Sequence, residues 1–550
     1  MTDWIETLPL GDLLVRAAAL HAERAALVFP DERFSYRELL DGARHIARGL
    51  SELGVRPGEH VGLLMPNCQE FVEALFGVSL LGAVTVPINA RYKLTELGYV
   101  IENADLVAIL TSNVIEEHVD FTEVLRTSLP ALASSPDPTK LDLPEAPRLR
   151  AAVTLRGEGQ PGFLGRKAFD EFAARADADV VERLRHQVRV RDIATILYTS
   201  GTTSHPKGCM LTHEALSRGS VLRLRERILD SDHDVFWSAG PLFHIGSLQL
   251  FLGSVGTFGT YLADAHFDPG RALEMMSREG VTSAWPWFPA IIQSLLGDPT
   301  FTPEMLSTLR TMMLIGPTAL LERVQALFPW ARLINGCGMT ETAGLYAVSE
   351  PDDSIEQRTS TGGTVVRGVE IRIVDTDTGE DLPPGEIGEI LVRGYVTMSG
   401  YYRDPEKTAD ALDADGWLHT HDLYIQRKSG HLTFQGRGKD MLKVGGENVA
   451  AVEIEAFLAE HPAVRLAEVV GIPDPRLDEV PVAFVELHPG QEIATDELIN
   501  FCRGRIAAWK VPRAVYIVEA EDWPMSATKV DKGALRTRLL EATATIKGTL

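Results

Sequence analysis

Cysteine is scarce in this chain, which contains only Cys68, Cys209, Cys337 and Cys502. No two of them form a Cys-x-x-Cys pair, and no His-Glu-x-x-His motif occurs among the 15 histidines. The spacing therefore argues against a structural zinc site, a zinc-protease helix and a disulfide framework.

Long apolar runs and an excess of positive charge are absent as well. Glycine or polar residues interrupt the apolar stretches, so we expect no membrane-spanning helix. The N-terminus has no basic segment followed by an apolar one, which argues against a signal peptide. The net charge of -24 repels nucleic acid and anionic lipid. We therefore expect a cytoplasmic protein without a nucleic-acid partner.

Strand and helix patterns alternate along the N-terminal part of the chain. Ser35 and Glu38 have the spacing of a capping box, and apolar residues then recur at helical intervals up to Leu50. We expect a further helix over 71–81 and short buried strands over 60–65, 83–88 and 106–111. This alternation favours an α/β fold with largely parallel sheets.

The chain is too long for a single hydrophobic core, because 550 residues exceed the usual size of one domain. Pro, Ser and Asp are frequent in residues 131–150, which we interpret as a surface loop or linker. Composition changes again near Gly436. We expect a large N-terminal domain (1–436) of parallel-rich sheets with helices plus a β-rich section, and a small mobile α+β C-terminal domain (437–550).

The most informative stretch is 195–208, TILYTSGTTSHPKG. An apolar strand leads into a loop of small residues whose backbone N–H groups can cradle phosphate oxygens. It is not a Walker A loop, because Pro206 and Gly208 flank the lysine, so a magnesium ligand must lie elsewhere. The alternative is a solvated Ser/Thr/Gly loop. The candidate phosphate-binding residues are Thr199, Ser200, Gly201, Thr202, Thr203 and Lys207.

This string resembles the signature of the adenylate-forming superfamily, which contains acyl-CoA synthetases, adenylation domains of peptide synthetases and beetle luciferases. Further motifs follow in the order of that family, so the resemblance covers nearly the whole chain; Ser204 is a departure within the loop. The resemblance implies that the protein binds ATP, Mg2+, a carboxylic acid and coenzyme A.

Residues 338–341 match the Gly-x-Thr-Glu motif of that family. By resemblance, Gly338 and Met339 line the nucleotide site, Thr340 hydrogen-bonds the α-phosphate, and Glu341 binds magnesium. A carboxylate is the oxygen ligand that this hard cation prefers, and the phosphate loop offers none. A helix cap is the alternative, because Thr followed by Glu is common at helix starts.

The adenine site departs from the family pattern. Gly316, Pro317 and Thr318 fall where the family has its adenine-lining turn, and the sequence there is irregular. Cys337 stands where the family usually has an aromatic residue stacked on adenine. We therefore expect a weaker contact with the base.

Two further motifs resemble the ribose-binding and hinge segments of the family. Residues 417–422 resemble Trp-x-x-Thr-Gly-Asp, in which Asp422 would hold the ribose hydroxyls and His421 replaces the usual Gly. Arg437 would reach the ribose or phosphate. Lys439 occupies the hinge position.

The C-terminal motifs imply one loop for the thiol and one lysine for the first step. Lys443, Gly445, Gly446 and Glu447 resemble the loop that faces coenzyme A. Lys529 resembles the catalytic lysine, although the usual Gly before it is missing, and Lys532 is a competitor for the role.

The acyl pocket is less determined by the sequence. Residues 241–244 resemble the segment that borders it, and His244 is a candidate gate. Trp287, Gly316 and Gly338 are candidate pocket residues, although a plain core role is an equal alternative for the tryptophan. No charge for an amino group is evident, so we favour a fatty or aromatic monocarboxylic acid.

Taken together, the motifs predict an ATP-dependent acid–thiol ligase that forms an acyl-adenylate and then an acyl-CoA thioester. The resemblance leaves open transfer to a carrier protein or an amine. The departures also leave open a catalytically degenerate nucleotide-binding protein. A homodimer is a further expectation.

Overall fold

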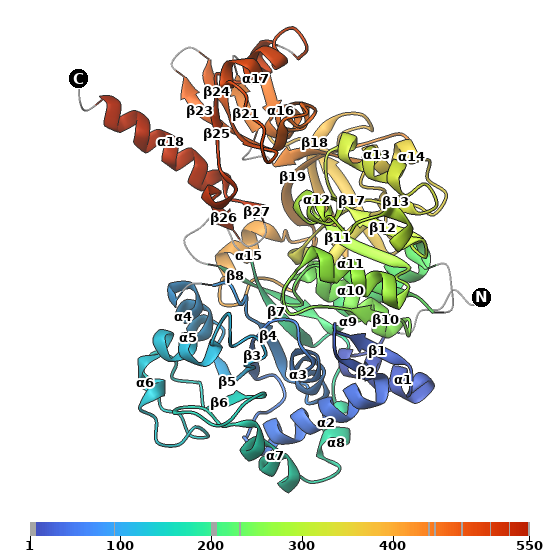
Figure 1. Ribbon diagram of the computed structural model, residues 1–550. Helices are drawn as coiled ribbons and strands as arrows, with labels where there is room; N and C mark the ends of the chain where they lie inside the picture. Colours follow the sequence, from blue (N-terminus) through green and yellow to red (C-terminus); the bar gives the residue numbers. More distant parts are fainter. Residues whose placement is uncertain are drawn as a thin grey trace. The chain divides into compact units, whose positions relative to one another are not determined.

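The computed structural model describes residues 7–92, 94–199, 206–229, 233–437, 441–444, 447–474, 477–506, 508–526 and 529–547. The chain forms two compact units (Figure 1). The N-terminal unit comprises Met1–Gly316, Leu321–Glu370 and Val392–Leu418, and the C-terminal unit comprises Pro317–Leu320, Ile371–Leu391 and His419–Leu550. The domain boundary at residue 436 stays a prediction, and the predicted hinge Lys439 lies outside the described residues.

A six-stranded sheet occupies one part of the N-terminal unit, in the order β6-β5-β3-β4-β7-β8. All neighbouring strands are parallel except β7 and β8, which are antiparallel and flank the phosphate loop. Its inner strands are continuous apolar runs because both faces are covered. The strands are β3 (His60–Leu64), β4 (Val84–Pro87), β5 (Leu106–Thr111), β6 (Ala151–Thr154), β7 (Ile193–Thr199) and β8 (Lys207–Thr212).

A seven-stranded sheet lies in the same unit, in the order β13-β12-β11-β9-β10-β1-β2. Only the β1–β2 pair is antiparallel, and β1 returns from the N-terminus to pair with β10. The strands are β1 (Ala25–Val28), β2 (Arg33–Ser35), β9 (Val235–Ser238), β10 (Thr260–Leu262), β11 (Ser283–Trp287), β12 (Thr311–Leu314) and β13 (Arg332–Ile334).

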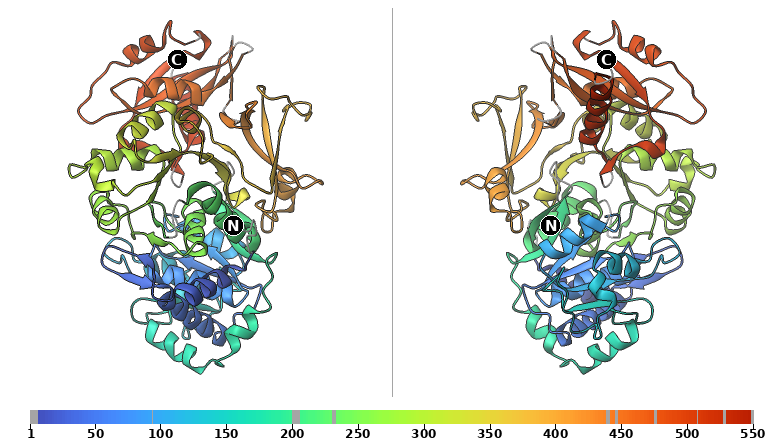
Figure 2. Two further views of the ribbon diagram at one scale, coloured as in Figure 1. Left: turned by 90° about the vertical axis from the view of Figure 1, so that its right-hand side faces the viewer. Right: turned by 90° about the vertical axis from the view of Figure 1, so that its left-hand side faces the viewer.

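Helices α1 (Leu10–His21), α3 (Gln69–Leu80) and α10 (Ile245–Gly256) join the two sheets into one unit (Figure 1 and Figure 2). Helix α3 packs on β3 and β4, α10 packs on β9 and β10, and α1 contacts both helices. Nearly every residue of α3 and α10 is buried, as expected for helices enclosed on all sides. Helix α2 (Tyr36–Glu52) has the predicted Ser35–Glu38 capping box and packs on α3.

The other helices of the N-terminal unit connect its strands. They are α4 (Leu94–Asn103), α5 (Phe121–Ser128), α6 (Pro130–Ala133), α7 (Arg166–Arg175), α8 (Val180–Arg185), α9 (His213–Arg223), α11 (Pro269–Glu279), α12 (Pro289–Gly297), α14 (Ile355–Ser360) and α15 (Pro405–Ala411), with the π-helix η1 (Leu224–Ile228) and the 3-10 helices η2 (Pro303–Leu306) and η3 (Thr340–Thr342). Helix α13 (Thr318–Leu327) begins in residues assigned to the C-terminal unit.

Two smaller sheets follow in the sequence. One contains β14 (Gly336–Met339), β15 (Gly344–Val348) and β16 (Thr364–Val365) in that order. The other contains β17 (Val369–Val374), β18 (Ile387–Gly394), β19 (Leu418–Gln426) and β20 (Leu432–Arg437), and the division between the units runs through it.

The C-terminal unit has a five-stranded sheet with helices on both faces (Figure 2). Val469 and Val470 alternate between the faces: the first packs in the core with α16 and α17, and the second packs with Trp523 and α18. The strands are β21 (Met441–Val444), β22 (Glu447–Ala450), β23 (Val464–Asp474), β24 (Asp478–Leu487) and β25 (Ala514–Ile517), with the separate hairpin β26 (Met525–Ser526) and β27 (Lys529–Val530). The helices are α16 (Ala451–Ala459), α17 (Thr495–Cys502), α18 (Lys532–Lys547), η5 (Ala508–Lys510) and η6 (Ala520–Asp522).

The predicted α/β class and the early strands and helices are confirmed. Residues 134–150 form no helix or strand, as the interpretation of 131–150 as a loop predicts, but the segment is anchored in the core. Leu132, Leu141, Leu143 and Leu149 of this segment are buried in the core beside the six-stranded sheet. The Pro and Asp residues favour this irregular backbone, and the intervening leucines anchor it in the core. No helix among the described residues is both long and apolar enough to cross a bilayer.

Candidate active site

The phosphate loop joins two antiparallel strands of the six-stranded sheet. Thr199 ends β7 and Lys207 begins β8, and the two residues are paired across the strands. The predicted phosphate-binding residues Ser200, Gly201, Thr202 and Thr203 lie outside the described residues, as does Ser204. The described ends therefore place Thr199 and Lys207 together at the base of the loop.

The segment that carries Thr340 and Glu341 is a tight turn between β14 and β15. The Thr342 hydroxyl accepts a hydrogen bond from the Met339 N–H at 3.1 Å and donates to the Gly344 carbonyl at 2.7 Å. Gly338 permits the two strands to approach, since a Cβ there would lie 2.4 Å from the Gly344 oxygen. The turn is therefore fixed by its own side chain and by its glycine.

Arg223, at the end of α9, holds this turn from the core. Its guanidinium donates to the carbonyl of Ala343 at 3.0 Å and to that of Leu345. The side chain is fully buried, and burial lowers its pKa to about 10. Ala343 has φ 46°, a left-handed conformation that costs a non-glycine residue energy, so the arginine hydrogen bonds secure a strained turn.

The segment 398–402 runs between β8 and the Thr340–Glu341 turn. The Met398 N–H donates to the Glu341 carbonyl at 2.8 Å, and the Tyr402 N–H donates to the Gly208 carbonyl at 2.7 Å. Met210 exchanges hydrogen bonds with Ser399 and Gly400 on the same edge. One short backbone segment therefore links the strand that begins at Lys207 to the residue predicted to bind magnesium.

The side chain of Tyr401 lies between the two predicted phosphate-site residues. Its hydroxyl donates to Glu341 Oε1 at 2.8 Å, and the Lys207 Nζ lies 4.9 Å from its ring centroid. Burial and the Glu341 carboxylate raise the pKa of Tyr401, so the hydroxyl keeps its proton at neutral pH. The structure thus brings Lys207 and Glu341 together around one aromatic ring.

The donor set at Glu341 fits magnesium. No group of three or more His, Cys, Asp or Glu side chains suited to a metal occurs among the described residues. Magnesium usually binds to one or two carboxylates together with substrate phosphates, not to a cage made only of protein groups. Glu341 is 8% exposed and supplies one such carboxylate.

Cys337 does not extend toward open space. It is buried, and its Sγ lies 3.8 Å from the carbonyl oxygen of Gly362. A Cβ on Gly362 would lie 2.1 Å from that sulfur. An aromatic ring at position 337 could not follow the direction of the cysteine side chain and would need another rotamer.

Of the predicted acyl-pocket residues, His244, Trp287 and Gly316 lie at or beside the seven-stranded sheet, whereas Gly338 belongs to β14 of the three-stranded sheet. His244 precedes α10, and a Cβ on Gly246 in its first turn would lie 3.2 Å from the Trp287 ring. Trp287 ends β11 with φ 66°, and its carbonyl accepts from Ile315, next to Gly316. Burial lowers the pKa of His244 to about 4, so the imidazole is neutral at neutral pH. Within the described residues, His244 Nε2 and Trp287 Nε1 are buried without a hydrogen-bond partner.

The predicted ribose residues lie in the C-terminal unit. Asp422 of β19 and Arg437 of β20 are paired across the antiparallel strands. The structure describes the backbone of Arg437 but not its side chain. His421 has φ 57°, which explains why glycine is usual at this position, and its N–H donates to Glu389 Oε1 at 2.8 Å. Pro317 and Thr318 also fall in this unit, before α13 and at its first residue.

The two C-terminal motifs lie on separate hairpins of the C-terminal unit. Lys443 and Glu447 belong to β21 and β22, whose turn, Gly445–Gly446, lies outside the described residues. Lys529 is exposed in β27, opposite Ser526. Its competitor Lys532 is held by Glu455 at 2.5 Å and by Glu468 at 3.5 Å.

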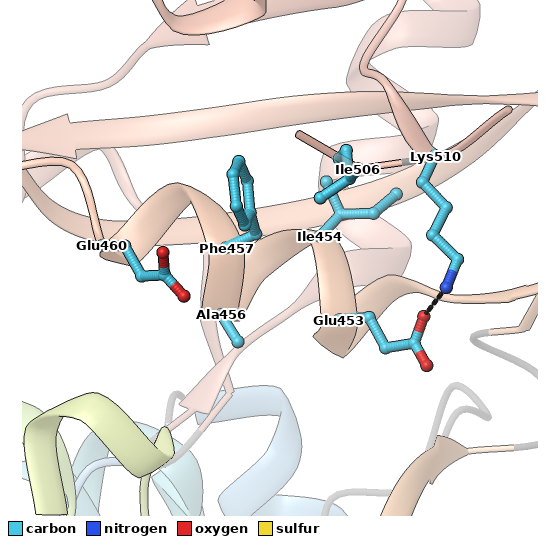
Figure 3. Close-up of a pocket in the computed structure, with 7 residues that line it drawn as sticks. All are labelled: Glu453, Ile454, Ala456, Phe457, Glu460, Ile506 and Lys510. Atoms are coloured by element: carbon cyan, nitrogen blue, oxygen red, sulfur yellow. Dashed lines mark hydrogen bonds and ion pairs between the residues drawn. The ribbon is translucent and has the colours of Figure 1, made fainter. Parts of the chain in front are cut away.

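A cavity of about 350 Å³ also lies in the C-terminal unit (Figure 3). Ile454, Phe457 and Ile506 form its apolar wall, and Glu453 and Lys510 pair at its edge. None of the predicted site residues lines it.

Sequence comparison identifies both parts of the chain. Residues 14–402 match the AMP-binding enzyme family, and residues 453–529 match the AMP-binding enzyme C-terminal domain. The chain belongs to the AMP-binding enzyme family. The predicted membership of the adenylate-forming superfamily is therefore confirmed.

Two of the following three similar proteins are named as coenzyme A ligases. A propanoyl:CoA ligase of Rhodococcus jostii, whose acyl group carries a methyl-dioxo-octahydroindenyl ring, is 34% identical, with 98% of this chain and 99% of that protein covered. The anthranilate CoA ligase AuaEII, solved with anthranoyl-AMP, is 28% identical with a TM-score of 0.83 and 99% of both chains covered. ATP-bound MatB from Rhodopseudomonas palustris is 26% identical with a TM-score of 0.80, covering 96% of this chain and 98% of that chain.

Sequence reasoning missed Tyr401 and Arg223. Tyr401 lies in a polar stretch, SGYYRDPEKT, that reads as a turn leading to a helix cap. Arg223 resembles any basic residue near the end of a helix. Only the fold shows that the first contacts Glu341 and that the second is buried behind the same turn.

Proposed function

We propose that this member of the family joins a carboxylic acid to coenzyme A at the expense of ATP, through an acyl-adenylate. The observation that carries the proposal is the convergence of Lys207 and Glu341 on Tyr401. An ammonium and a carboxylate held together beside a glycine-rich loop suit a bound metal–nucleotide phosphate. Similarity along nearly the whole chain to a CoA ligase solved with anthranoyl-AMP and to ATP-bound MatB supports the same conclusion.

In the first step, an oxygen of the substrate carboxylate attacks the α-phosphorus of ATP, and the bond to pyrophosphate breaks. The charge that develops on phosphate oxygens requires fixed positive groups, so positioning and electrostatics supply most of the catalysis. Lys207 donates to these oxygens and Thr340 orients the α-phosphate, while Glu341 would hold magnesium. Magnesium, when bound, neutralises phosphate charge.

In the second step, the coenzyme A sulfur attacks the adenylate carbonyl and AMP leaves with the bonding electron pair. Asp422 and Arg437 would bind the ribose throughout, and Cys337, Gly316, Pro317 and Thr318 would border the base. Lys443, Gly445, Gly446 and Glu447 would face the thiol.

The catalytic lysine of the first step is assigned to Lys529, not to Lys532. Lys532 is 22% exposed and its charge is already matched by Glu455 and Glu468 within the C-terminal unit. Lys529 is exposed at a hairpin, where a cationic side chain is accessible to a substrate. Lys529→Ala should therefore abolish adenylate formation with little change in stability, whereas Lys532→Ala should lower stability more than activity.

A two-orientation cycle is part of this proposal. Lys529 and the 443–447 hairpin belong to separate sheets of one unit, and each is required in a different step. Rotation about a hinge near Lys439 would present them in turn, as in other enzymes with domain closure. Lys529→Ala should then still convert a supplied acyl-adenylate and coenzyme A to thioester.

The acid is proposed to be fatty or aromatic. Phe243, His244 and Trp287 lie at or near the first turn of α10 and the end of β11, and the imidazole is neutral at neutral pH. The charge of Arg91 adds to burial in lowering the pKa of His244. A cytoplasmic location and a homodimer stay predictions.

The experiment that tests the function is pyrophosphate release over a panel of fatty, aromatic and amino acids, with and without coenzyme A. We expect release with a fatty or aromatic acid and thioester formation when coenzyme A is present. Release without thioester would indicate a carrier-protein or amine acceptor. Absence of ATP–pyrophosphate exchange with every acid would contradict the proposal and indicate a degenerate nucleotide-binding protein.

A further inference from the structure

The side chain of Tyr401 contacts both Lys207 and Glu341. It is 7% exposed, so its hydrogen bond and its ring contact are shielded from bulk water. Such shielding strengthens both kinds of electrostatic contact. The residue thus links the base of the phosphate loop to the predicted metal ligand.

The backbone around Tyr401 is fixed independently of that side chain. The Tyr401 N–H donates to Thr408 Oγ1 at 2.9 Å, and Cys209 pairs with Tyr401 as an isolated β-bridge. Met398 on one side and Tyr402 on the other bind the Glu341 turn and β8 through backbone hydrogen bonds. A change confined to the Tyr401 side chain therefore leaves these supports in place.

We propose that Tyr401 is a positioning residue for adenylate formation, whose hydroxyl orients the Glu341 carboxylate for magnesium and whose ring holds the Lys207 ammonium. This rests on the proposed function of the site. The role differs from that of a catalytic residue because Tyr401 acts through the two groups it contacts.

The hydroxyl contact selects one oxygen of the carboxylate. Tyr401 donates to Oε1, and Oε2 of Glu341 accepts no hydrogen bond from the part of the chain that the structure describes. A carboxylate held through one oxygen cannot rotate freely, so the other oxygen keeps a defined direction for a cation. Groups that orient a metal ligand in this way typically change metal affinity 10–100-fold when they are removed.

The ring contact suits Lys207 for a different reason. An aromatic face attracts an ammonium group without neutralising its charge. It also accepts no strong hydrogen bond from the N–H groups of the ammonium. A carboxylate partner would instead form an ion pair that a phosphate must displace. Tyr401 therefore orients Lys207 and leaves its donors available for phosphate oxygens.

Three variants separate these contacts. Tyr401→Phe removes only the hydroxyl, and Tyr401→Leu removes the ring as well. Tyr402→Phe is the matched control, because its hydroxyl also donates to a carboxylate, Asp105 Oδ2 at 2.8 Å, outside the proposed site. Each variant is compared with the wild type by calorimetric ATP binding in magnesium and in EDTA, by thermal unfolding, and by magnesium titration of pyrophosphate release.

We expect Tyr401→Phe to weaken ATP binding in magnesium by about 10–100-fold and to leave binding in EDTA within about twofold. The magnesium concentration for half-maximal release should rise, and excess magnesium should restore kcat. Tyr401→Leu should weaken binding in EDTA too, because Lys207 loses its support. Tyr402→Phe should change neither binding constant.

Equal weakening with and without magnesium in Tyr401→Phe would overturn the proposal, and so would an unchanged magnesium requirement. The same loss in Tyr402→Phe would show that any buried hydroxyl here matters only for folding. Because ATP calorimetry needs no acid, a wild type that binds ATP but forms no thioester would count against the proposed function and not against the role of Tyr401.

Discussion

Glu73 gives a quantitative test of how the N-terminal unit is packed. Its side chain is buried on α3, its Oε1 accepts from Gln69 Nε2 at 2.6 Å, and a Cβ on Gly42 of α2 would lie 2.0 Å from that oxygen. Burial raises the pKa of Glu73 from 4.5 to about 7, with Glu70 adding to the rise and the hydrogen bond, Arg166 and Arg156 opposing it.

The sign and size of the effect follow from the two pKa values. Below pH 4.5 the carboxyl is protonated in both the folded and the unfolded chain, so it imposes no cost. Between 4.5 and about 7 the unfolded chain loses its proton first, so the free energy of unfolding falls as pH rises. At about 1.4 kcal/mol for each pH unit, the cost reaches about 1 kcal/mol at pH 5 and about 3 kcal/mol at pH 8.

Glu73→Gln should remove this cost, because the amide keeps an oxygen for Gln69 and carries no charge. The variant should be more stable than the wild type by about 3 kcal/mol at pH 8 and by about 1 kcal/mol at pH 5. Hydrogen exchange of the α2 and α3 amides measures this within the N-terminal unit, without assuming that both units unfold together. Glu171→Gln makes the same chemical change at an exposed position of α7. A Glu73→Gln difference that is the same at both pH values would refute the burial argument.

The site itself yields three further predictions. Glu341→Gln should slow pyrophosphate release by at least about a hundredfold, since charge-stabilising groups in such sites contribute at that level; near-normal turnover at low magnesium would sink the magnesium assignment. Lys207→Ala should reduce adenylate formation while thermal unfolding stays close to that of the wild type, and a large stability loss with normal specific activity would indicate a purely structural lysine. Arg223→Leu should leave the carbonyls of Ala343 and Leu345 unpaired in the core and cost about 2–4 kcal/mol in denaturant unfolding. A loss below about 0.5 kcal/mol there would show that the turn does not depend on the arginine.

The sequence was sufficient for the elements whose signals are local. The capping box at Ser35 predicts the start of α2, and the apolar runs predict β3, β4 and β5 because a strand covered on both faces must be apolar throughout. The order of strands in the sheets could not be predicted, since β1 pairs with β10 across more than two hundred residues. Local patterns carry no information about such partners.

At His421 and Cys337 the chain departs from the family motif, and the structure shows the conformation and contacts of each residue. A missing glycine suggests lost function, yet His421 adopts the positive φ that glycine allows, and its N–H donates to the Glu389 carboxylate. A missing aromatic suggests a weaker base contact, and Cys337 is buried with its sulfur against Gly362, a direction that an aromatic ring could not follow. The departure at His421 therefore concerns backbone conformation, and the departure at Cys337 concerns side-chain packing.

Lys529 and Lys532 are the two candidates for the catalytic lysine, and the spacing of the motif does not distinguish them. Spacing allows either lysine, because one residue is missing before the first. In the fold, Lys532 at the start of α18 pairs with Glu455 of α16 and Glu468 of β23, so its removal would leave like charges facing each other. A lysine with that structural role cannot also move to a reacting phosphate without breaking the packing of its own unit. Lys529 lies exposed on the two-stranded hairpin β26–β27, outside the five-stranded sheet, and this exposure supports the proposal that it is the lysine of the first step.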